Sequence, residues 1–375
     1  MGNDNENGEH WYVVSNAEEV SSPALLVYPQ RIESNIARMI SVAGDVSRLR
    51  PHVKTHKTPF VVRMLTDKGI RKFKCATIAE AEMTASAGAT DILLAVQPVG
   101  PNIDRLLELK RKFPSVTFSC IADCDTVIRE LSERSASLGL ETPVWLDLNI
   151  GMNRTGIAPG KQAVDLFRLI SELPGLVAGG LHAYDGHIHD HDLTVRKQKC
   201  DEAYTGVTFM ISEISRYHHG NIKVVAGGSP TFPIHAAREG VETSPGTVLL
   251  WDDGYGKAFK DMKYLCAAVL LSRVISKPAE DLICIDLGHK AVASEMPHPR
   301  VKLCGFDNYE FVAHNEEHLV IRLPEAGLMK VGDVVYCIPW HICPTVDRHD
   351  LAYVIKAGHV TGKWSVEARR RVISV

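Results

Sequence analysis

Short hydrophobic runs alternate along the chain from Ser22 onward with longer segments in which apolar residues recur at helical spacing. This alternation is typical of repeated β-strand and α-helix units, which build a parallel sheet. The runs that we interpret as strands are 24–28, 49–54, 73–76, 92–96, 117–122, 144–150, 180–184, 223–226 and 248–251. Their number is close to that of a (β/α)8 barrel. The pattern therefore predicts an α/β fold with a TIM barrel over residues 22–257.

Helix starts are also encoded locally. Between the third and fourth predicted strands, Thr77-Ile78-Ala79-Glu80 has the spacing of a capping box, in which a threonine and a glutamate satisfy the free amides of a first helical turn. We expect a helix that begins there and ends near Gly88, because glycine commonly terminates helices.

The pattern of hydrophobic residues changes after Gly254-Tyr255-Gly256, where hydrophobic runs follow one another with little helical periodicity between them. These runs cover 267–275, 282–287, 318–323, 334–339 and 353–359. They predict a C-terminal, mostly antiparallel β domain over residues 258–375. Residues 11–14 are also strand-like, so we expect the N-terminal segment 1–21 to join this domain.

The bulk composition limits the classes of protein to which the chain can belong. Its 375 residues exceed the usual size of a single core, which agrees with one large domain and a smaller one. The hydrophobic content of 45% and the net charge of −3 favour a soluble globular protein without a nucleic-acid-binding face. The nine cysteines follow no regular spacing, which favours reduced thiols. Since no secretory signal or membrane-spanning run is visible, we expect a cytoplasmic protein without membrane partners.

A lysine stands at the end of the second predicted strand, in the segment Arg50-Pro51-His52-Val53-Lys54-Thr55-His56-Lys57. If the segment is extended, His52, Lys54 and His56 share one face, where the two imidazoles add no permanent charge. Burial and nearby cations disfavour the ammonium form of a lysine, and a neutral amine is the nucleophile that forms a Schiff base with a carbonyl cofactor. The alternative interpretation is a basic surface loop that happens to contain two histidines.

Two segments late in the predicted barrel have the composition of anion-binding loops. Gly227-Gly228-Ser229-Pro230-Thr231 follows a hydrophobic run, and its glycines allow backbone amides to approach a phosphate. Phosphate sites of TIM barrels often lie after the late strands. Ser244-Pro245-Gly246-Thr247 is a second candidate for the same anion. A plain turn is the alternative interpretation of a glycine pair.

Further polar residues follow two other predicted strands. Arg154 lies between two glycines after the run 144–150 and could contact a cofactor oxygen or a substrate carboxylate, although a surface ion pair is an equally common use. Tyr184 closes a later run and could pack against a flat cofactor. His187, His189 and His191 are candidates for a base or a metal contact, with a solvated loop as the alternative.

The β domain carries one candidate metal pair, His341 and Cys343, in Trp340-His341-Ile342-Cys343-Pro344. Imidazole and thiolate form a nitrogen and sulfur pair suited to Zn²⁺. Because only two ligands are evident, the remaining positions would be open, as they are when a metal acts as a Lewis acid. His318 is a candidate for a nearby outer group.

Several of these motifs belong to one set that runs through nearly the whole chain. The set comprises Ser22–Val27, Arg50–Lys57, Lys74–Thr77 with Glu80-Ala81-Glu82, Gln97–Pro101, Gly151-Met152-x-Arg154-Thr155-Gly156, Ala183-Tyr184-x-Gly186, Gly227-Gly228 and His341-x-Cys343. Together these segments resemble the D-threonine aldolase and D-serine dehydratase family. That family belongs to the fold-type III, alanine-racemase-like enzymes, which use pyridoxal 5′-phosphate (PLP).

The resemblance implies roles for individual residues. Lys54 would form the Schiff base with PLP, Gly227, Gly228 and their neighbours would hold the phosphate, and Arg154 and Tyr184 would touch the cofactor. His341 and Cys343 would bind a divalent metal beside the β-hydroxyl of the substrate. The resemblance also implies a barrel with a C-terminal β domain, paired head-to-tail in a homodimer.

Two reactions depend on this same set of residues. We predict a D-threonine aldolase, which cleaves small D-3-hydroxy-amino acids between Cα and Cβ to glycine and an aldehyde, because the N-terminal motifs look closest to that branch. A cysteine at the second metal position instead looks like the zinc-dependent dehydratases, so a D-serine or D-3-hydroxyaspartate dehydratase is the alternative. The thiolate favours zinc over Mn²⁺ or Mg²⁺ in either case.

Two further classes fit the sequence less well. An amino-acid racemase needs a second base on the opposite face of Cα, and no segment clearly matches the tyrosine that alanine racemases use. A non-catalytic PLP carrier of the small barrel type would lack both the β domain and the metal pair.

Overall fold

The computed structural model describes residues 10–375, which form two compact units. Of the described residues, the first unit holds 10–37, Thr55–Lys57 and Thr247–Arg369, and the second holds Arg38–Lys54, Thr58–Gly246 and Arg370–Val375. Residues 1–9 of the predicted segment 1–21 lie outside the described residues. The division into functional domains at 22–257 and 258–375 stays a prediction.

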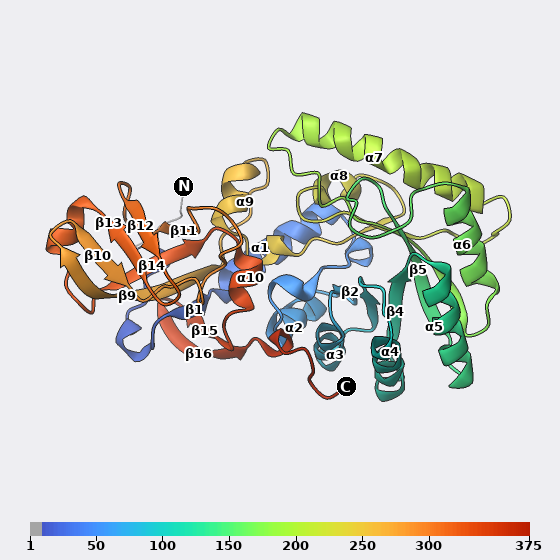
Figure 1. Ribbon diagram of the computed structural model, residues 1–375, viewed down its shortest axis with the longest axis horizontal. Coiled ribbons are helices and arrows are strands. Elements are labelled where there is room, and N and C mark those ends of the chain that lie inside the picture. The colour runs from blue at the N-terminus through green and yellow to red at the C-terminus, as the bar shows by residue number, and fades with distance from the viewer. Residues whose placement is uncertain (1–9) are drawn as a thin grey trace. The chain divides into compact units, whose positions relative to one another are not determined.

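The second unit is built on a seven-stranded, entirely parallel sheet in the sequential order β2 to β8 (Figure 1). Its strands are β2 (Lys72–Cys75), β3 (Asp91–Leu94), β4 (Thr117–Ala122), β5 (Thr142–Leu148), β6 (Leu176–Ala183), β7 (Val224–Ala226) and β8 (Val241–Thr243). One face is filled by a cluster of Leu93, Ile121, Trp145 and Val225. Each of these residues comes from a different strand, so the interior is a packed layer of side chains.

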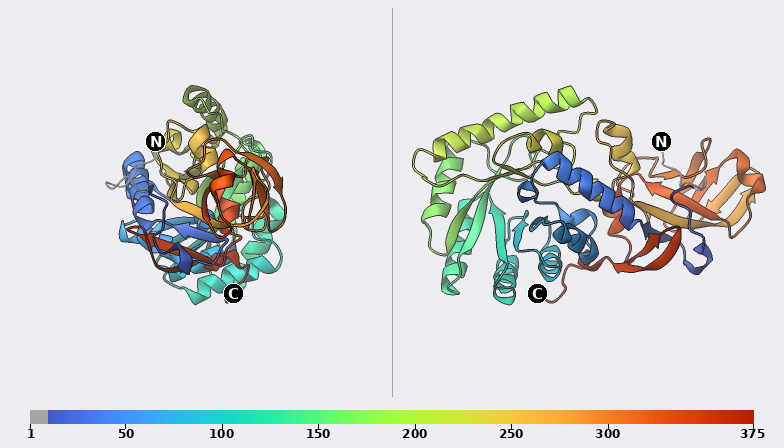
Figure 2. Two further views of the ribbon diagram at one scale, coloured as in Figure 1. Left: turned by 90° about the vertical axis from the view of Figure 1, so that its left-hand side faces the viewer. Right: turned by 180° about the vertical axis from the view of Figure 1, so that it is seen from behind.

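Helices alternate with these strands and cover their other face. They are α2 (Pro59–Asp67), α3 (Ile78–Ser86), α4 (Pro101–Lys112), α5 (Asp125–Ser137), α6 (Lys161–Glu172), α7 (Leu193–Ile214) and α8 (Phe232–Ala236), while α1 (Pro29–Ala43) runs from the first unit into the second. Figure 1 and Figure 2 show α3 to α6 lined up along the outside of the strands. None of the helices within residues 10–375 combines the length and apolarity that a bilayer crossing requires.

The capping box predicted at the start of α3 is confirmed. Thr77 Oγ1 accepts a hydrogen bond of 3.1 Å from the backbone amide of Glu80, and the Glu80 carboxylate accepts one of 2.6 Å from the amide of Ala76. The first contact satisfies a backbone donor of the first turn, and the second satisfies the amide of Ala76, one residue before the N-cap Thr77, rather than that of Thr77 itself.

The strand predicted over 49–54 is wrong in its second half. Residues 49–52 bridge both edges of the parallel sheet: the amide of Arg50 donates to Thr243 O at 2.8 Å, and the amide of Lys74 donates to Pro51 O at 2.9 Å. The chain then turns into a 3₁₀ helix, Val53–Thr55, so His52, Lys54 and His56 do not alternate along a strand. Pro51 has no amide hydrogen, which limits regular pairing here. The barrel prediction is thus confirmed in part, as seven parallel strands that do not form a complete eight-stranded barrel.

Arg50 fixes the segment 49–52 against the sheet. Its guanidinium is 1% exposed, donates to both carboxylate oxygens of Asp91 at 2.7 and 2.9 Å, and donates to Glu242 at 2.8 Å. Lys72 contacts the same Glu242 carboxylate. Because Asp91 lies on β3 and Glu242 on β8, this one side chain is bound to strands near both edges of the sheet.

The first unit contains a mostly antiparallel sheet in the order β12-β13-β10-β9-β1-β15-β16, with β14 pairing to β9 and β11. The strands are β1 (Ala24–Val27), β9 (Ala268–Ala279), β10 (Leu282–Ile285), β11 (Val301–Leu303), β12 (Glu310–His314), β13 (Leu319–Arg322), β14 (Val334–Pro339), β15 (Leu351–Lys356) and β16 (His359–Ser365). Short helices α9 (Asp253–Ala258) and α10 (Ile342–Val346) complete the unit together with 3₁₀ turns. The predicted antiparallel β domain is therefore confirmed as an architecture.

The sheet predicted for one strand is wrong, and two other predicted strands are absent. The run 24–28 was expected in the barrel, but β1 lies between β9 and β15, parallel only to β15. All four β1 residues are buried, as suits a central strand of either sheet, so hydrophobicity alone cannot assign it. Residues 248–251 contain a 3₁₀ turn, Thr247–Leu249. Residues 11–14 form no strand, although Tyr12 and Val14 pack into the core beside Tyr336.

Substituting Arg50 with methionine is expected to lower the free energy of unfolding by about 3 kcal/mol, because the carboxylates of Asp91 and Glu242 would lose their buried partner. Urea denaturation measures this loss. The matched control is Arg111→Met, since the Arg111 side chain is 62% exposed and pairs only with Glu108 on the helix surface. The control should change stability by no more than about 0.5 kcal/mol. Equal losses in both variants would contradict the anchoring role of Arg50.

Candidate functional site

Tyr184 is the centre of the candidate site in the second unit, directly after β6. The Arg154 Cζ atom lies 4.9 Å from the centroid of its ring, and the amines of Lys74 and Lys54 lie 5.6 and 5.8 Å from it. The structure therefore brings together three residues that the sequence singled out for cofactor contact, Lys54, Arg154 and Tyr184. Lys74, on β2, was not foreseen. Cations near an aromatic face are attracted by its negative charge density.

The turn after β7 touches the same ring. Gly227 has a φ of +77°, and an added Cβ would lie 2.6 Å from His235 Cδ2, so the turn accepts only glycine without a shift. A Cβ on Gly228 would lie 3.1 Å from Tyr184 Cε2. The Gly228 amide donates to Thr231 Oγ1 at 3.3 Å. The glycines thus let the backbone of the turn pack closely against His235 and Tyr184.

The second predicted anion-binding segment lies beside the first. The amide of Gly246 donates to Ser229 Oγ at 3.2 Å, which joins the two turns. Ser244 Oγ is buried and has no hydrogen-bond partner among the described residues. The boundary between the two units falls between Gly246 and Thr247. Within the first unit, the hydroxyl of Thr247 lies 3.5 Å from Cys343 Sγ.

A buried network behind the glycine turn was not predicted. Asp185 accepts a hydrogen bond of 2.8 Å from Thr231 Oγ1 and lies 2.8 Å from His235 Nε2. Although burial opposes ionisation, the hydrogen bonds from His235 and Thr231 hold the pKa of Asp185 below its usual value. Asp185 follows Tyr184 in the chain, so the network ties the tyrosine to the turn that it touches.

Asp185, His235 and Cys200 also have the spacing of a metal-binding group, with ligand atoms within 4.8 Å of one another. Arg238 lies 3.0 Å from His235 Nδ1, and a guanidinium can only donate, so the imidazole proton is on Nε2 and points to Asp185. Burial, reinforced by Asp185, raises the pKa of Cys200 to about 12. With both nitrogens occupied and the thiol protonated, the chemistry of this group favours a hydrogen-bonded support for the turn.

One of the three predicted histidines after β6 packs against the arginine loop. An added Cβ on Gly151, whose φ is +118°, would lie 2.7 Å from His187 Nε2. His187 Nδ1 is buried and has no hydrogen-bond partner within residues 10–375. His189 and His191 are exposed. His187 therefore differs from His189 and His191 in that it contacts the loop that carries Arg154.

The first unit contains the predicted metal pair. His341 precedes α10, and its imidazole forms a hydrogen bond with the Cys343 thiol, while its Nδ1 lies 2.5 Å from Glu295 Oε1. Burial opposes both charged forms, yet the imidazole and two threonine hydroxyls lower the pKa of Cys343, and the thiolate raises the pKa of His341 to about 9. Each group of the pair therefore favours the charged form of the other. The threonines are Thr55, at 3.2 Å from Cys343 Sγ, and Thr247.

Glu295 is the residue of this group that sequence analysis missed. It precedes His341 by 46 positions, with no motif between them. His318, which the sequence suggested as an outer group, is exposed in the turn between β12 and β13. A carboxylate on one imidazole nitrogen fixes the tautomer and leaves the other nitrogen directed elsewhere, as in many metal sites.

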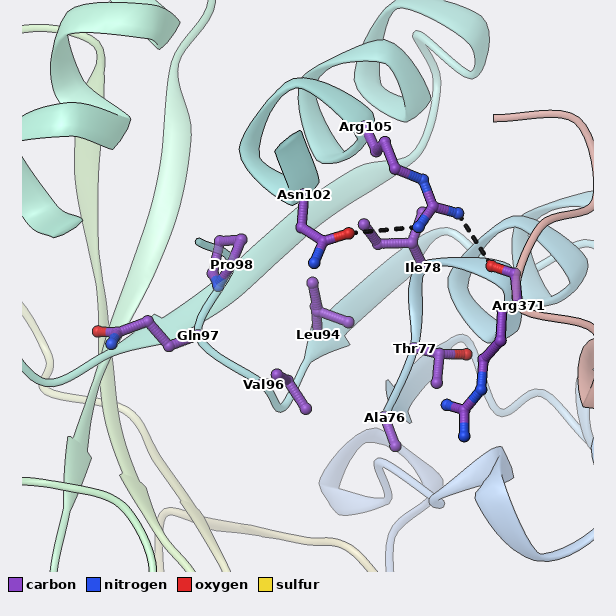
Figure 3. A pocket seen from close by; sticks show the side chains of 10 residues that line it. All are labelled: Ala76, Thr77, Ile78, Leu94, Val96, Gln97, Pro98, Asn102, Arg105 and Arg371. Carbon is purple, nitrogen blue, oxygen red and sulfur yellow. Dashed lines mark hydrogen bonds between the residues drawn. The ribbon is translucent and has the colours of Figure 1, made fainter. Parts of the chain in front are cut away.

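A cavity of about 230 Å³ lies at the carboxyl ends of β2 and β3 (Figure 3). Arg105 extends along its wall and donates to Asn102 Oδ1 at 3.2 Å and to Arg371 O at 3.0 Å. Gln97 and Pro98, from the segment Gln97–Pro101 singled out in the sequence, also line it. None of the predicted site residues does, so the cavity is separate from the Tyr184 cluster.

Comparison with known protein families covers most of the chain. Residues 27–252 match the model of the alanine racemase N-terminal domain, and residues 267–355 match that of a putative serine dehydratase domain. A D-threonine aldolase from an Arthrobacter species is 27% identical over 358 residues, which cover 93% of each chain. A 3-hydroxy-D-aspartate aldolase of Paracoccus denitrificans is 27% identical over 94% of this chain and 92% of its own.

A dehydratase is similar over a shorter region. The D-threo-3-hydroxyaspartate dehydratase of a Delftia species is 27% identical over 239 residues, or 62% of each chain. Among solved structures, the D-threonine aldolase of Filomicrobium marinum superimposes with a TM-score of 0.85 at 26% identity, covering 94% of this chain and 96% of its own. Taken with the match over residues 27–252, these similarities establish that the chain belongs to the fold-type III, alanine-racemase-like family of PLP enzymes that includes the D-threonine aldolases.

Proposed function

We propose that the protein is a PLP- and divalent-metal-dependent lyase that cleaves D-3-hydroxy-amino acids between Cα and Cβ, as D-threonine aldolases do. The observation that carries this proposal is the convergence of Lys54 and Arg154 on the ring of Tyr184, beside a turn that accepts only glycine. Similarity to named aldolases over more than nine-tenths of the chain supports the choice of reaction.

The residues of the second unit fit PLP. Gly227 and Gly228 form a tight turn against His235 and Tyr184 that is proposed to hold the phosphate through its backbone amides. The hydroxyl of Ser244, buried and without a hydrogen-bond partner among the described residues, is available as a further donor. Ser229 and Gly246 belong to the same proposed phosphate-binding group. Lys54 would attach the cofactor covalently, and Arg154 and Tyr184 would orient its ring. When bound, PLP supplies an electron sink that weakens the bonds at the Cα of an attached amino acid.

The residues of the first unit fit a divalent metal. His341 and Cys343 supply a nitrogen and a sulfur donor, and Glu295 holds the imidazole from its far side. A thiolate ligand favours Zn²⁺ over Mn²⁺ or Mg²⁺. A metal bound there would supply Lewis acidity to a substrate hydroxyl. Two threonines contact the thiol, Thr55 and Thr247, and each directly follows a residue proposed to bind PLP, Lys54 or Gly246.

The base that removes the proton of the substrate hydroxyl is proposed to be His187. Its buried Nδ1 has no hydrogen-bond partner among the residues that the structure describes, whereas His189 and His191 are exposed to solvent. Packing against Gly151 holds His187 beside the loop of Arg154, so its imidazole has a fixed position.

The proposal has further parts. The bridges of residues 49–52 to β8 and β2 support counting this segment as the eighth strand of a TIM barrel. We also propose that the chain is divided into functional domains at 22–257 and 258–375. It would form a homodimer and be located in the cytoplasm.

A dehydratase is the second candidate. Cys343 favours it, because a cysteine at this position looks like the zinc-dependent dehydratases, and the similarity to the Delftia dehydratase supports it. A D-serine or D-3-hydroxyaspartate dehydratase would release a 2-oxo acid and ammonia from the same class of substrate. The products therefore separate the two functions.

Protein incubated with D-threonine, PLP and Zn²⁺ is expected to release glycine and acetaldehyde, measured by chromatography and by coupled reduction of the aldehyde. L-Threonine serves as the stereochemical control. The Lys54→Ala variant should be inactive, because it lacks the amine that attaches PLP. Formation of 2-oxobutyrate and ammonia would reassign the protein as a dehydratase, and inversion at Cα to L-allo-threonine would make it a racemase.

The substitution Glu295→Gln is expected to weaken Zn²⁺ binding by about 10- to 100-fold, because the carboxylate orients His341. Competition with a chromophoric chelator measures the affinity. Cys343→Ala should lose more, since it removes a ligand, whereas Glu325→Gln, an exposed carboxylate of the same unit, should leave the affinity unchanged. Equal affinities in the wild type and all three variants would refute the proposed metal pair.

Changing Gly227 to alanine is expected to raise the Kd for PLP by at least about tenfold, or about 1.4 kcal/mol, because the added Cβ meets His235. Gly240→Ala is the matched control: Gly240 has a φ of +72°, close to that of Gly227, but nothing lies within 4 Å of its added Cβ. Backbone strain is thus similar in both variants. Fluorescence titration with PLP gives the Kd, and a similar loss for Gly240→Ala would show that strain alone is responsible.

A further inference from the structure

Lys74 is a second amine on the inner face of the parallel sheet. On β2, Cys75 points to the helices, where its Sγ lies 3.7 Å from Thr84 Oγ1 of α3. Because side chains alternate along a strand, Lys74 points to the opposite, inner face. The residue is 2% exposed, and its amine lies 5.6 Å from the Tyr184 ring centroid, at nearly the distance of the Lys54 amine.

Two buried residues on neighbouring strands belong to the same layer. Asp147 of β5 and His182 of β6 are direct neighbours in the sheet, and His182 Nδ1 lies 2.6 Å from Asp147 Oδ1. Thr155 donates to the other carboxylate oxygen at 2.9 Å. Despite burial, the hydrogen bond from His182 holds the pKa of Asp147 below its usual value, so Asp147 is an anion. His182 therefore carries its proton on Nδ1.

The far nitrogen of His182 is unsatisfied. Burial lowers the pKa of His182 despite Asp147, so the ring is neutral and Nε2 is an acceptor. Among the residues that the structure describes, none forms a hydrogen bond with Nε2. An unpaired acceptor in a buried site is costly unless a ligand or a neighbouring donor uses it.

Lys74 differs from the structural cations of the same sheet. Lys72, two residues earlier on the same face, pairs with Glu242, and Arg50 pairs with both Glu242 and Asp91. Within residues 10–375, Lys74 has neither an ion pair nor a side-chain hydrogen bond. A buried amine without a partner destabilises a fold, so its presence beside Tyr184 needs another explanation.

We propose that Lys74 is a positioning residue that sets the charge around the cofactor held at Lys54, on the same inner face of the sheet as the unpaired acceptor of His182. The inference rests on the proposed function, because it takes Lys54 as the amine that binds PLP. As an ammonium, Lys74 would present a positive charge beside the Tyr184 ring. As a neutral amine, it presents none, so the electronic state of bound PLP depends on the protonation of Lys74.

The groups that face Lys74 from neighbouring elements favour a change of charge near neutral pH. Burial and the Lys54 ammonium lower the pKa of Lys74, with a smaller contribution from Arg50, while Asp185 and Asp147 raise it. The balance brings the pKa of Lys74 to about 7, from an ordinary value of 10.5. The titration therefore occurs in the range in which most enzymes operate.

The variant Lys74→Met tests the inference through the absorbance of bound PLP between about pH 5.5 and 9.5. The wild-type holoenzyme is expected to show an inflection within this pH range, and the variant to lose it or to shift it by about one pH unit or more. The control is Lys110→Met: Lys110 is half-buried on α4, and its amine donates to Phe118 O at 3.3 Å. The control should titrate like the wild type, and an unchanged inflection in Lys74→Met would overturn the inference.

Lys74→Arg provides a second variant that keeps a positive charge at every pH tested. Its absorbance should lack the inflection and remain in the state that the wild type shows at low pH. If Lys74→Met does not fold, an inflection retained in Lys74→Arg overturns the inference by itself.

Borohydride reduction followed by peptide mapping distinguishes this inference from the proposed function. Cofactor attached to Lys54 supports the function, and with that result the pH titration alone decides the role of Lys74. Cofactor attached to Lys74 would overturn both the inference and the assignment of Lys54.

Stability gives a readout independent of the cofactor. Because the pKa of Lys74 is lowered in the folded state, the unfolded chain binds more protons between about pH 7 and 10.5, and wild-type stability should fall as the pH decreases through this window. The cofactor-free Lys74→Met variant should show a flatter dependence of urea midpoint on pH. Identical pH dependences would contradict a buried, titrating Lys74.

Discussion

The contact between the Arg50 guanidinium and the carboxylates of Asp91 and Glu242 is the interaction on which the second unit depends. A guanidinium cannot lose its proton at any ordinary pH, so a buried arginine must be paired. The pairing fixes residues 49–52 between the first and last strands of the sheet, although Pro51 prevents a regular strand there. Lys54 follows Arg50 by four residues, so the ion pairs of Arg50 also fix where Lys54 lies in the site.

Hydrogen bonds between consecutive loops then shape the site above the sheet. Asp185 holds Thr231 and His235, Thr231 holds the amide of Gly228, and Gly228 touches Tyr184, which precedes Asp185 in the chain. Because these contacts connect the two loops at several points, the loops after β6 and β7 cannot move independently. A preorganised loop of this kind binds an anion without first losing conformational freedom.

A structural feature can be predicted from the sequence when the residues that cause it are close together in the chain. The capping box of α3 and the bounds of β4 and β14 were predicted correctly, because each rests on a few consecutive residues. β1 was assigned to the wrong sheet, since sheet membership depends on partners such as Leu351–Lys356, far away in the chain. Motifs singled out Lys54, Arg154 and Tyr184, which the structure brings together around one ring. Asp185 with His235 and Glu295 with His341 were missed, because 50 and 46 residues separate the partners. The polar residues in Lys72-Phe73-Lys74-Cys75 were a visible signal that charged groups enter the sheet interior.

The lowered pKa of the Cys343 thiol has a consequence for handling the protein. A thiolate reacts with alkylating agents and oxidants far faster than a protonated thiol does, and two threonine hydroxyls beside this sulfur favour its charged form. Burial instead raises the pKa of other thiols, such as those of Cys75, Cys120 and Cys266. We therefore expect Cys343 to be alkylated or oxidised before these buried cysteines when the protein is kept without a reductant.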